Sequence, residues 1–161
     1  MEEDQVIRDP FRSQREELIQ PFPDQYIDKK GKYSYIKHGQ LAQRLIQVVG
    51  PFNFFVKELI FDSDQVLTGA IVRLELYIDG EYQIIEQTGA IEHRQDNNAQ
   101  NLKHAESDGF KRCCAKLGLG LQTWNEDQYW LHKKFNVTPF VSTLKETGQR
   151  EGGVIDHEEN E

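Results

Sequence analysis

Two groups of basic side chains are the residues best suited to chemistry in this sequence. In the first group Lys111 and Arg112 are adjacent, Lys116 follows one helical turn after Arg112, and Lys103 precedes Lys111 by about two turns. The second group combines cations with rings and comprises Lys29, Lys30, Lys32, Lys37, Tyr33 and Tyr35. Amines can follow a phosphate backbone while rings stack on bases, so the combination suits single-stranded nucleic acid. A solvated charged surface is the alternative interpretation.

Catalytic arrangements are much weaker in the sequence. It has no Gly-x-x-x-x-Gly-Lys-Ser/Thr loop for a nucleotide. His104 and Asp108 lie one helical turn apart and could share a metal ion, but pairing of Asp108 with Arg112 at i,i+4 is favoured. Cys113 and Cys114 lie on or beside an apolar face, which favours core packing over a nucleophilic role. We therefore expect no enzyme activity, no cofactor and no metal, and keep a metal-dependent nuclease as an alternative.

The charge of the chain is unevenly distributed. The 161 residues carry a net charge of −8, of which residues 1–28 contribute −5, residues 29–134 contribute +1 and residues 145–161 contribute −4. The central part is therefore nearly neutral and can carry a local basic patch. We expect an acidic, flexible segment at 1–14, a DNA-binding domain at 15–135, and an acidic segment at 136–161 that is disordered at its end.

Composition also indicates the compartment. The two cysteines are adjacent and cannot form a disulfide framework, which favours a reducing environment. No apolar run approaches the roughly 20 residues that span a bilayer, and the first residues lack the features of a secretory signal. We therefore expect a cytoplasmic protein, in a bacterium or a phage-infected cell, with no membrane partner.

Local patterns predict the elements that must position the basic groups. Apolar residues at helical spacing predict helices over 38–49 and 101–117, ended by Gly50-Pro51 and by Gly118, and a short helix over 14–20. Two β-prone runs, 25–28 and 33–36, flank a glycine and predict a hairpin. Segments 52–61, 68–78 and 81–91 predict three strands of an antiparallel meander, with Asp79-Gly80 as a tight turn. The fold class is α+β: hairpin, helix, three-stranded antiparallel meander, helix. We place Trp124, Tyr129 and Trp130 in the core or at a subunit interface rather than against bases.

One stretch of the sequence resembles a known family. The run Ser107-Asp108-Gly109-Phe110-Lys111-Arg112-Cys113-Cys114-Ala115-Lys116-Leu117-Gly118 resembles the signature helix of the Rad52 superfamily of single-strand annealing proteins. Two further matches are Tyr35-Ile36 followed by the helix that ends at Gly50, and Pro21-Phe22-Pro23 near the start. The resemblance covers about residues 15–135 and includes bacterial and phage types and the DdrA branch.

The resemblance implies a function, partners and site residues. Members bind single-stranded DNA and anneal complementary strands without ATP in recombination and break repair, as rings with DNA in an outer groove. By position Lys111 and Arg112 match the DNA-contacting pair. Gln40 replaces a family arginine, so Lys37 or Arg44 is expected to serve instead. The candidate DNA-binding residues are Lys111, Arg112, Lys116, Lys103, Lys37, Lys32, Lys30, Arg44 and Tyr35. Expected partners are single-stranded DNA, further copies in a ring or filament, and a single-strand binding protein or host recombination factor.

Three other functions remain open from the sequence. The first is protection of single-stranded 3′ ends without strong annealing, as in the DdrA branch. The second is the metal-dependent nuclease, which magnesium-dependent degradation of DNA would reveal. The third is a structural or RNA-binding α+β domain, for which similar affinity for duplex RNA and single-stranded DNA would be typical.

Overall fold

The fold combines a small hairpin, a three-stranded sheet and helices, as the sequence predicts. The computed structural model describes residues 13–125 and 128–134. The expected terminal segments, 1–14 and 136–161, lie outside these residues except for Ser13 and Gln14. The order is α1 (Gln14–Leu18), η1 (Asp24–Tyr26), β1 (Ile27–Lys30), β2 (Tyr33–Ile36), α2 (His38–Val49), β3 (Asn53–Phe61), β4 (Leu67–Ile78), β5 (Glu81–Ala90), α3 (Asn98–Lys116), α4 (Gln122–Asn125) and α5 (Leu131–Lys134).

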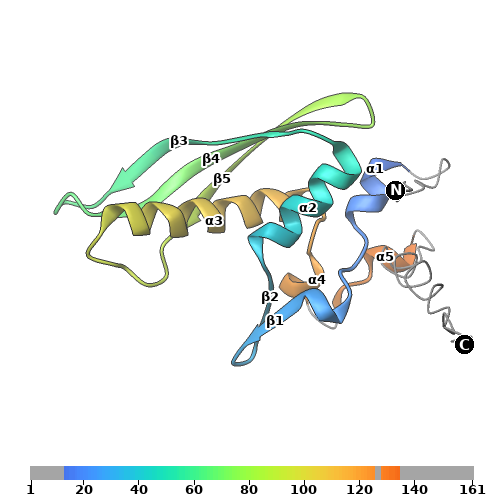
Figure 1. Ribbon diagram of the computed structural model, residues 1–161, viewed down its shortest axis with the longest axis horizontal. Helices are drawn as coiled ribbons and strands as arrows, with labels where there is room; N and C mark the ends of the chain where they lie inside the picture. Colours follow the sequence, from blue (N-terminus) through green and yellow to red (C-terminus); the bar gives the residue numbers. More distant parts are fainter. Residues whose placement is uncertain (1–12, 126–127, 135–161) are drawn as a thin grey trace, which may run out of the picture.

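The central sheet is the predicted antiparallel meander. Its strand order is β3-β4-β5, and β4 and β5 are joined through the turn at Asp79 and Gly80. Strand β4 alternates from Ala70 to Ile78, where Val72, Leu74 and Leu76 are buried while the residues between them face the opposite side. Figure 1 shows α3 running along one face of this sheet. The sheet therefore has one face in the core and one face without a helix among the described residues.

Two glycines allow α3 to lie directly on the sheet. A Cβ atom at Gly89 of β5 would stand 1.7 Å from the carbonyl oxygen of Ala105. A Cβ at Gly109 of α3 would stand 2.5 Å from a methyl carbon of Val72. Because real contacts do not reach these distances, only glycine fits at either position. The small residue in the Ser107–Gly118 motif is thus explained by packing of α3 against β4 and β5.

The core lies between the sheet, α2 and α3. Phe110 is fully buried at its centre, where the rings of Phe52 and Phe54 pack against it and the His38 ring stacks on it at 4.2 Å between centroids. Other members come from every part of the fold and include Leu18, Phe22, Ile36, Leu41, Leu45, Val48, Leu74, Cys113, Cys114 and Leu119. The C-terminal half of α3 is therefore packed against both the sheet and α2.

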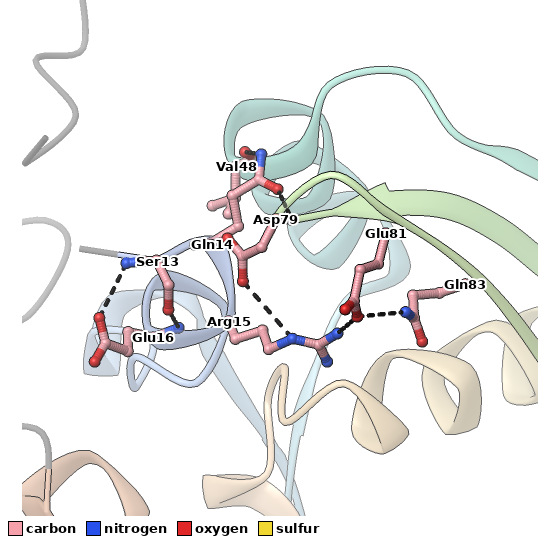
Figure 2. A network of polar contacts seen from close by, with 8 residues as sticks. All are labelled: Ser13, Gln14, Arg15, Glu16, Val48, Asp79, Glu81 and Gln83. Atoms are coloured by element: carbon pink, nitrogen blue, oxygen red, sulfur yellow. Dashed lines mark hydrogen bonds and ion pairs between the residues drawn. The ribbon is translucent and has the colours of Figure 1, made fainter. Parts of the chain in front are cut away.

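Helix α1 ties the start of the described chain to the sheet. Ser13 and Glu16 form a capping box at its N-terminus, with distances of 3.0 and 3.2 Å. The backbone N–H of Gln14 donates to Asp79 Oδ1 at 2.7 Å, and its side-chain amide donates to the carbonyl of Val48 at 2.9 Å. Figure 2 shows Arg15 reaching across to the carboxylates of Asp79 and Glu81. The tight turn between β4 and β5 is thus held against α1 and the end of α2.

The elements after residue 97 differ in part from the prediction. Helix α3 begins at Asn98, three residues before the predicted start, because the Asn97 side chain accepts a hydrogen bond from the Ala99 N–H and caps a polar first turn. Apolar periodicity does not reveal a turn whose residues, Ala99 apart, are polar amides. The short helices α4 and α5 were not predicted either. The helices of the described residues are all too short or too polar to cross a lipid bilayer.

Candidate nucleic-acid interface

The β1–β2 hairpin presents its tyrosines beside α3. Strand β1 pairs with β2 in antiparallel register, and a two-residue turn containing Gly31 joins Lys30 to Tyr33. Gly31 has φ of 62°, a conformation that glycine adopts without strain. Ile36 is buried in the core and anchors the hairpin, while Tyr33 is 65% exposed. The hairpin is therefore rigid at its base and open to solvent at its tip.

Helix α3 places Lys111 and Arg112 opposite this hairpin. Lys111 Nζ lies 5.6 Å from the centroid of the Tyr35 ring, and Arg112 Cζ lies 5.8 Å from that of Trp124. Both are distances at which a cation is attracted to an aromatic face. The adjacent residues Phe110 and Cys113 are fully buried, so the backbone that carries the two cations is fixed by the core.

The end of α3 turns the chain back toward the hairpin. The N–H of Gly118 donates to the carbonyl of Ala115, and the N–H of Leu119 donates to that of Cys114, both at 3.0 Å. With φ of 84° at Gly118, these bonds form a Schellman motif, the glycine ending that the sequence predicts. The short helix α4 then follows and packs against β2. This return brings Trp124 to the same place as Lys111 and Tyr35.

A pocket of about 280 Å³ lies where these elements meet. Its lining includes Tyr33 and Tyr35 from the hairpin, Lys111 from α3, Trp124 from α4, and Glu92 from the loop after β5. Trp124 is 50% exposed. The pocket thus combines aromatic rings with a cation and one carboxylate.

Arg112 is oriented by a carboxylate within α3. Its Nε donates to Asp108 Oδ2 at 2.8 Å, and the same oxygen accepts the N–H of Ala90 at 2.9 Å. Of the two roles considered for Asp108, pairing with Arg112 is therefore confirmed. The alternative was a metal ion shared with His104. No group of three or more metal-ligating side chains occurs in residues 13–125 and 128–134. Because Asp108 engages only Nε, the terminal nitrogens of the guanidinium can face another acceptor.

The remaining predicted cations are spread more widely. Lys32 lies at the hairpin turn, with its Nζ 5.3 Å from the Tyr33 ring, and Lys30 is the exposed partner of Tyr33 in β1. Lys37 precedes α2 and forms an ion pair with Asp28 at 3.2 Å. The two other cations of α3, Lys103 and Lys116, are exposed and do not line the pocket. Lys103 lies about 12 Å along the helix axis from Lys111.

Arg44 is placed differently from the expectation that it contacts DNA. Its side chain is buried, Nη1 donates to the carbonyl of Gln20 at 2.5 Å, and the guanidinium lies 3.6 Å from the centroid of the Phe22 ring. Burial lowers the pKa of Arg44 to about 10, an effect that Tyr129 opposes. A side chain enclosed in this way does not reach a phosphate, so the prediction that Arg44 contacts DNA is wrong. Arg44 is a structural residue that connects α2 to the segment before β1 through Gln20 and Phe22.

The cysteines and His38 lie behind the site. Cys113 and Cys114 are fully buried, which confirms their prediction as core residues. Burial raises the pKa of Cys113 to about 11 and holds that of Cys114 well above its ordinary value, which disfavours a thiolate nucleophile. Burial also lowers the pKa of His38; Glu106 acts against this shift and Lys111 adds to it.

Trp124 is the site residue that sequence reasoning missed. The core interpretation is confirmed for Tyr129, which is buried and donates a hydrogen bond to the carbonyl of Ile19. Trp124 and Trp130 are 50% and 62% exposed, so neither is a core residue, and the other part of the prediction, a place at a subunit interface, stays a prediction. A signal was present in the sequence, since Trp124 follows the glycines that end the signature helix by only a few residues. The general rule that tryptophan is buried outweighed it.

Comparison with known proteins places the chain in a family. A search of curated protein sequences gave no match. The family model described as Rad52/22 family double-strand break repair protein matches residues 16–140, which are 125 of the 161 residues. The match includes the hairpin, the sheet, α3 and the pocket between them. The chain therefore belongs to the Rad52/22 family of double-strand break repair proteins.

Proposed function

We propose that this protein, of bacterial or phage type, binds single-stranded DNA and anneals complementary strands without ATP in homologous recombination. The observation that carries the proposal is the convergence of Lys111, Arg112 and Tyr35 on one side of the molecule. Cations on a rigid helix can neutralise phosphates, and phosphate contacts leave base edges free for a second strand. Membership of a break-repair family supports the same function.

We further propose that several copies act together as a ring or filament. The sheet face opposite α3 supports this, because it exposes Phe55 (41%), Tyr77 (61%), Tyr82 (50%) and Ile84 (53%). Tyr77 and Tyr82 are cross-strand neighbours whose rings are in contact, and Ile84 lies two residues along β5 from Tyr82; apolar residues grouped in this way on a surface are typical of an interaction site. Assembly would multiply a modest basic patch along one strand, so that a nearly neutral domain binds a long strand tightly. Electron microscopy with and without an oligonucleotide tests this proposal: rings or filaments are expected, and a persistent monomer contradicts it.

The double variant Lys111→Ala, Arg112→Ala tests the DNA site. Both side chains are partly exposed, so the fold should remain, while binding and annealing of single-stranded DNA should be largely lost. Each lost phosphate contact lowers the log–log salt slope by about 0.7, so the slope should fall by about 1.4. A matched control, Lys57→Ala, Arg94→Ala, removes the same charge from exposed ion pairs with Glu86 and Asp62.

The outcomes separate the candidate functions. Retained annealing in the folded double variant contradicts the site assignment. Protection of 3′ ends against exonuclease without annealing by the unmodified protein would instead support the alternative function of the DdrA branch. DNA degradation that requires magnesium would favour the nuclease, and equal affinity for duplex RNA would favour the RNA-binding domain.

A further inference from the structure

The pocket beside Lys111 presents two aromatic rings from segments far apart in the chain. Tyr35 comes from the hairpin and Trp124 from α4, and both line the same space of about 280 Å³. Each ring lies beside a different cation of α3, at 5.6 Å for Lys111 and 5.8 Å for Arg112. Each of the two rings therefore has a cation of α3 beside it, Lys111 within the lining and Arg112 next to it, and half of the Trp124 surface is free.

The charge inside the pocket favours a neutral group over a phosphate. Glu92 lines the pocket together with Lys111, so a phosphate within it would lie near a carboxylate. A nucleobase is planar and uncharged, and it can bury an apolar face against a ring. The pocket is slightly smaller than the roughly 300–1,000 Å³ of small-molecule sites, a size that suits one base better than a stacked run.

We propose that Trp124 stacks on one base of the bound strand, while Lys111 and Arg112 contact the phosphates beside it. This inference rests on the proposed binding of single-stranded DNA and assigns the pocket to a base. Stacking uses the flat face of the base and leaves its pairing edge uncovered, as annealing requires. It is also tolerant of sequence, because every base has a π face.

Arg112 prepares Trp124 for this role. The guanidinium is held at Nε by Asp108, which in turn accepts the N–H of Ala90 at the end of β5. A fixed cation beside the indole restricts its orientations before DNA arrives, which lowers the entropy lost on binding. Because Arg112 packs beside the indole, removal of Trp124 also frees the guanidinium, and this alone can weaken the contact of Arg112 with a phosphate. The experiment must separate that loss of affinity from the loss of stacking.

An oligonucleotide without bases makes the separation. Affinities of Trp124→Ala are measured for a thymidine oligonucleotide and for an abasic sugar–phosphate strand of equal length. Stacking is worth about 1–3 kcal/mol per base, so binding to the first should weaken by roughly 5- to 150-fold, while binding to the second should change by less than about 2-fold. Trp124→Phe should retain most of the affinity for the thymidine oligonucleotide. If the Trp124→Ala protein does not fold, Trp124→Leu takes its place in both measurements.

The second tryptophan supplies the matched control. The chain has two tryptophans, and Trp130 is 62% exposed but does not line the pocket. Trp130→Ala should bind both strands as the unmodified protein does. In Trp130→Phe the remaining indole emission should be quenched by single-stranded DNA, whereas in Trp124→Phe it should not.

Each remaining outcome overturns a defined statement. An equal loss on both strands, or the absence of quenching in Trp130→Phe, assigns Trp124 a supporting role and overturns the stacking proposal alone. Failure of the unmodified protein to bind single-stranded DNA overturns the proposed function, and the stacking proposal with it.

Discussion

Replacement of Gly89 by alanine tests whether close packing of α3 on the sheet supports the whole fold. The added Cβ would lie 1.7 Å from the Ala105 carbonyl oxygen, 2.7 Å from the Ala105 carbonyl carbon and 2.9 Å from the Gly109 nitrogen. All three atoms belong to the backbone of α3, so no side chain can rotate away. To restore an ordinary contact of 3.4 Å, α3 must lift by about 1.7 Å at this point.

The energetic effect follows from what that movement disturbs. Helix α3 carries Ala105, Phe110, Cys113 and Cys114, which are all fully buried. Overpacking ordinarily costs about 1–3 kcal/mol. Here the new Cβ, fixed to the backbone of β5, clashes with the backbone of α3, so the cost lies at the upper end of that range or above it. We expect Gly89→Ala to lower the free energy of unfolding by at least about 3 kcal/mol. At a urea m-value of roughly 1–3 kcal/mol/M, the unfolding midpoint then falls by about 1–3 M.

Urea denaturation followed by circular dichroism measures this change, with Gly39→Ala as its control. Gly39 lies in the first turn of α2, and nothing lies within 4 Å of a Cβ built there. Alanine at this position should leave stability unchanged or raise it by up to about 1 kcal/mol. A Gly89→Ala protein within about 0.5 kcal/mol of the unmodified chain would refute the reasoning.

Two further predictions concern residues behind the interface. Arg44→Met should leave the Gln20 carbonyl without its guanidinium partner and lower the free energy of unfolding by about 1–3 kcal/mol. The DNA affinity of the folded protein should not change. A tenfold loss of affinity at unchanged stability would instead place Arg44 in the DNA site. Because burial lowers the pKa of His38 below 6.5, the unfolded chain binds the proton more readily, and stability should fall as pH decreases from above 6.5 through the folded-state pKa. His38→Phe keeps the ring stack on Phe110 and should show a smaller difference in urea midpoint between pH 7.5 and 5.5; an equal difference in both proteins would contradict the assignment.

Elements governed by neighbouring residues were predictable. Helix α2 occupies the predicted residues 38–49, because its apolar spacing and Gly50 are local signals. The same holds for the Asp79-Gly80 turn and for the glycine ending of α3. Strand β1 begins two residues later than predicted, at Ile27, after the short helix η1. Ends of this kind depend on capping and pairing more than on pattern.

The site itself was predictable only in part. The motif around Lys111 and Arg112 identified the helix that carries the cations, and the alternation of rings and lysines identified the hairpin. No local pattern states that Tyr35 and Lys111, 76 positions apart, line one pocket. The expected roles of Lys103 and Lys116 remain predictions, because exposure on α3 does not show which of them contacts a strand.

The sequence alone therefore determined the order of the elements from α1 to α3 apart from the short helix η1, the signature helix and the family, all of which depend on residues close together in the chain. The tertiary structure decided which side chains are available. Arg44 reads as an ordinary surface cation of an amphipathic helix, yet Gln20 and Phe22 enclose it. From its type Trp124 was expected in the core or at a subunit interface, yet the Schellman turn at Gly118 returns it to the pocket, half exposed. Burial is set by contacts between segments distant in sequence, and for this reason it follows from the fold rather than from residue type.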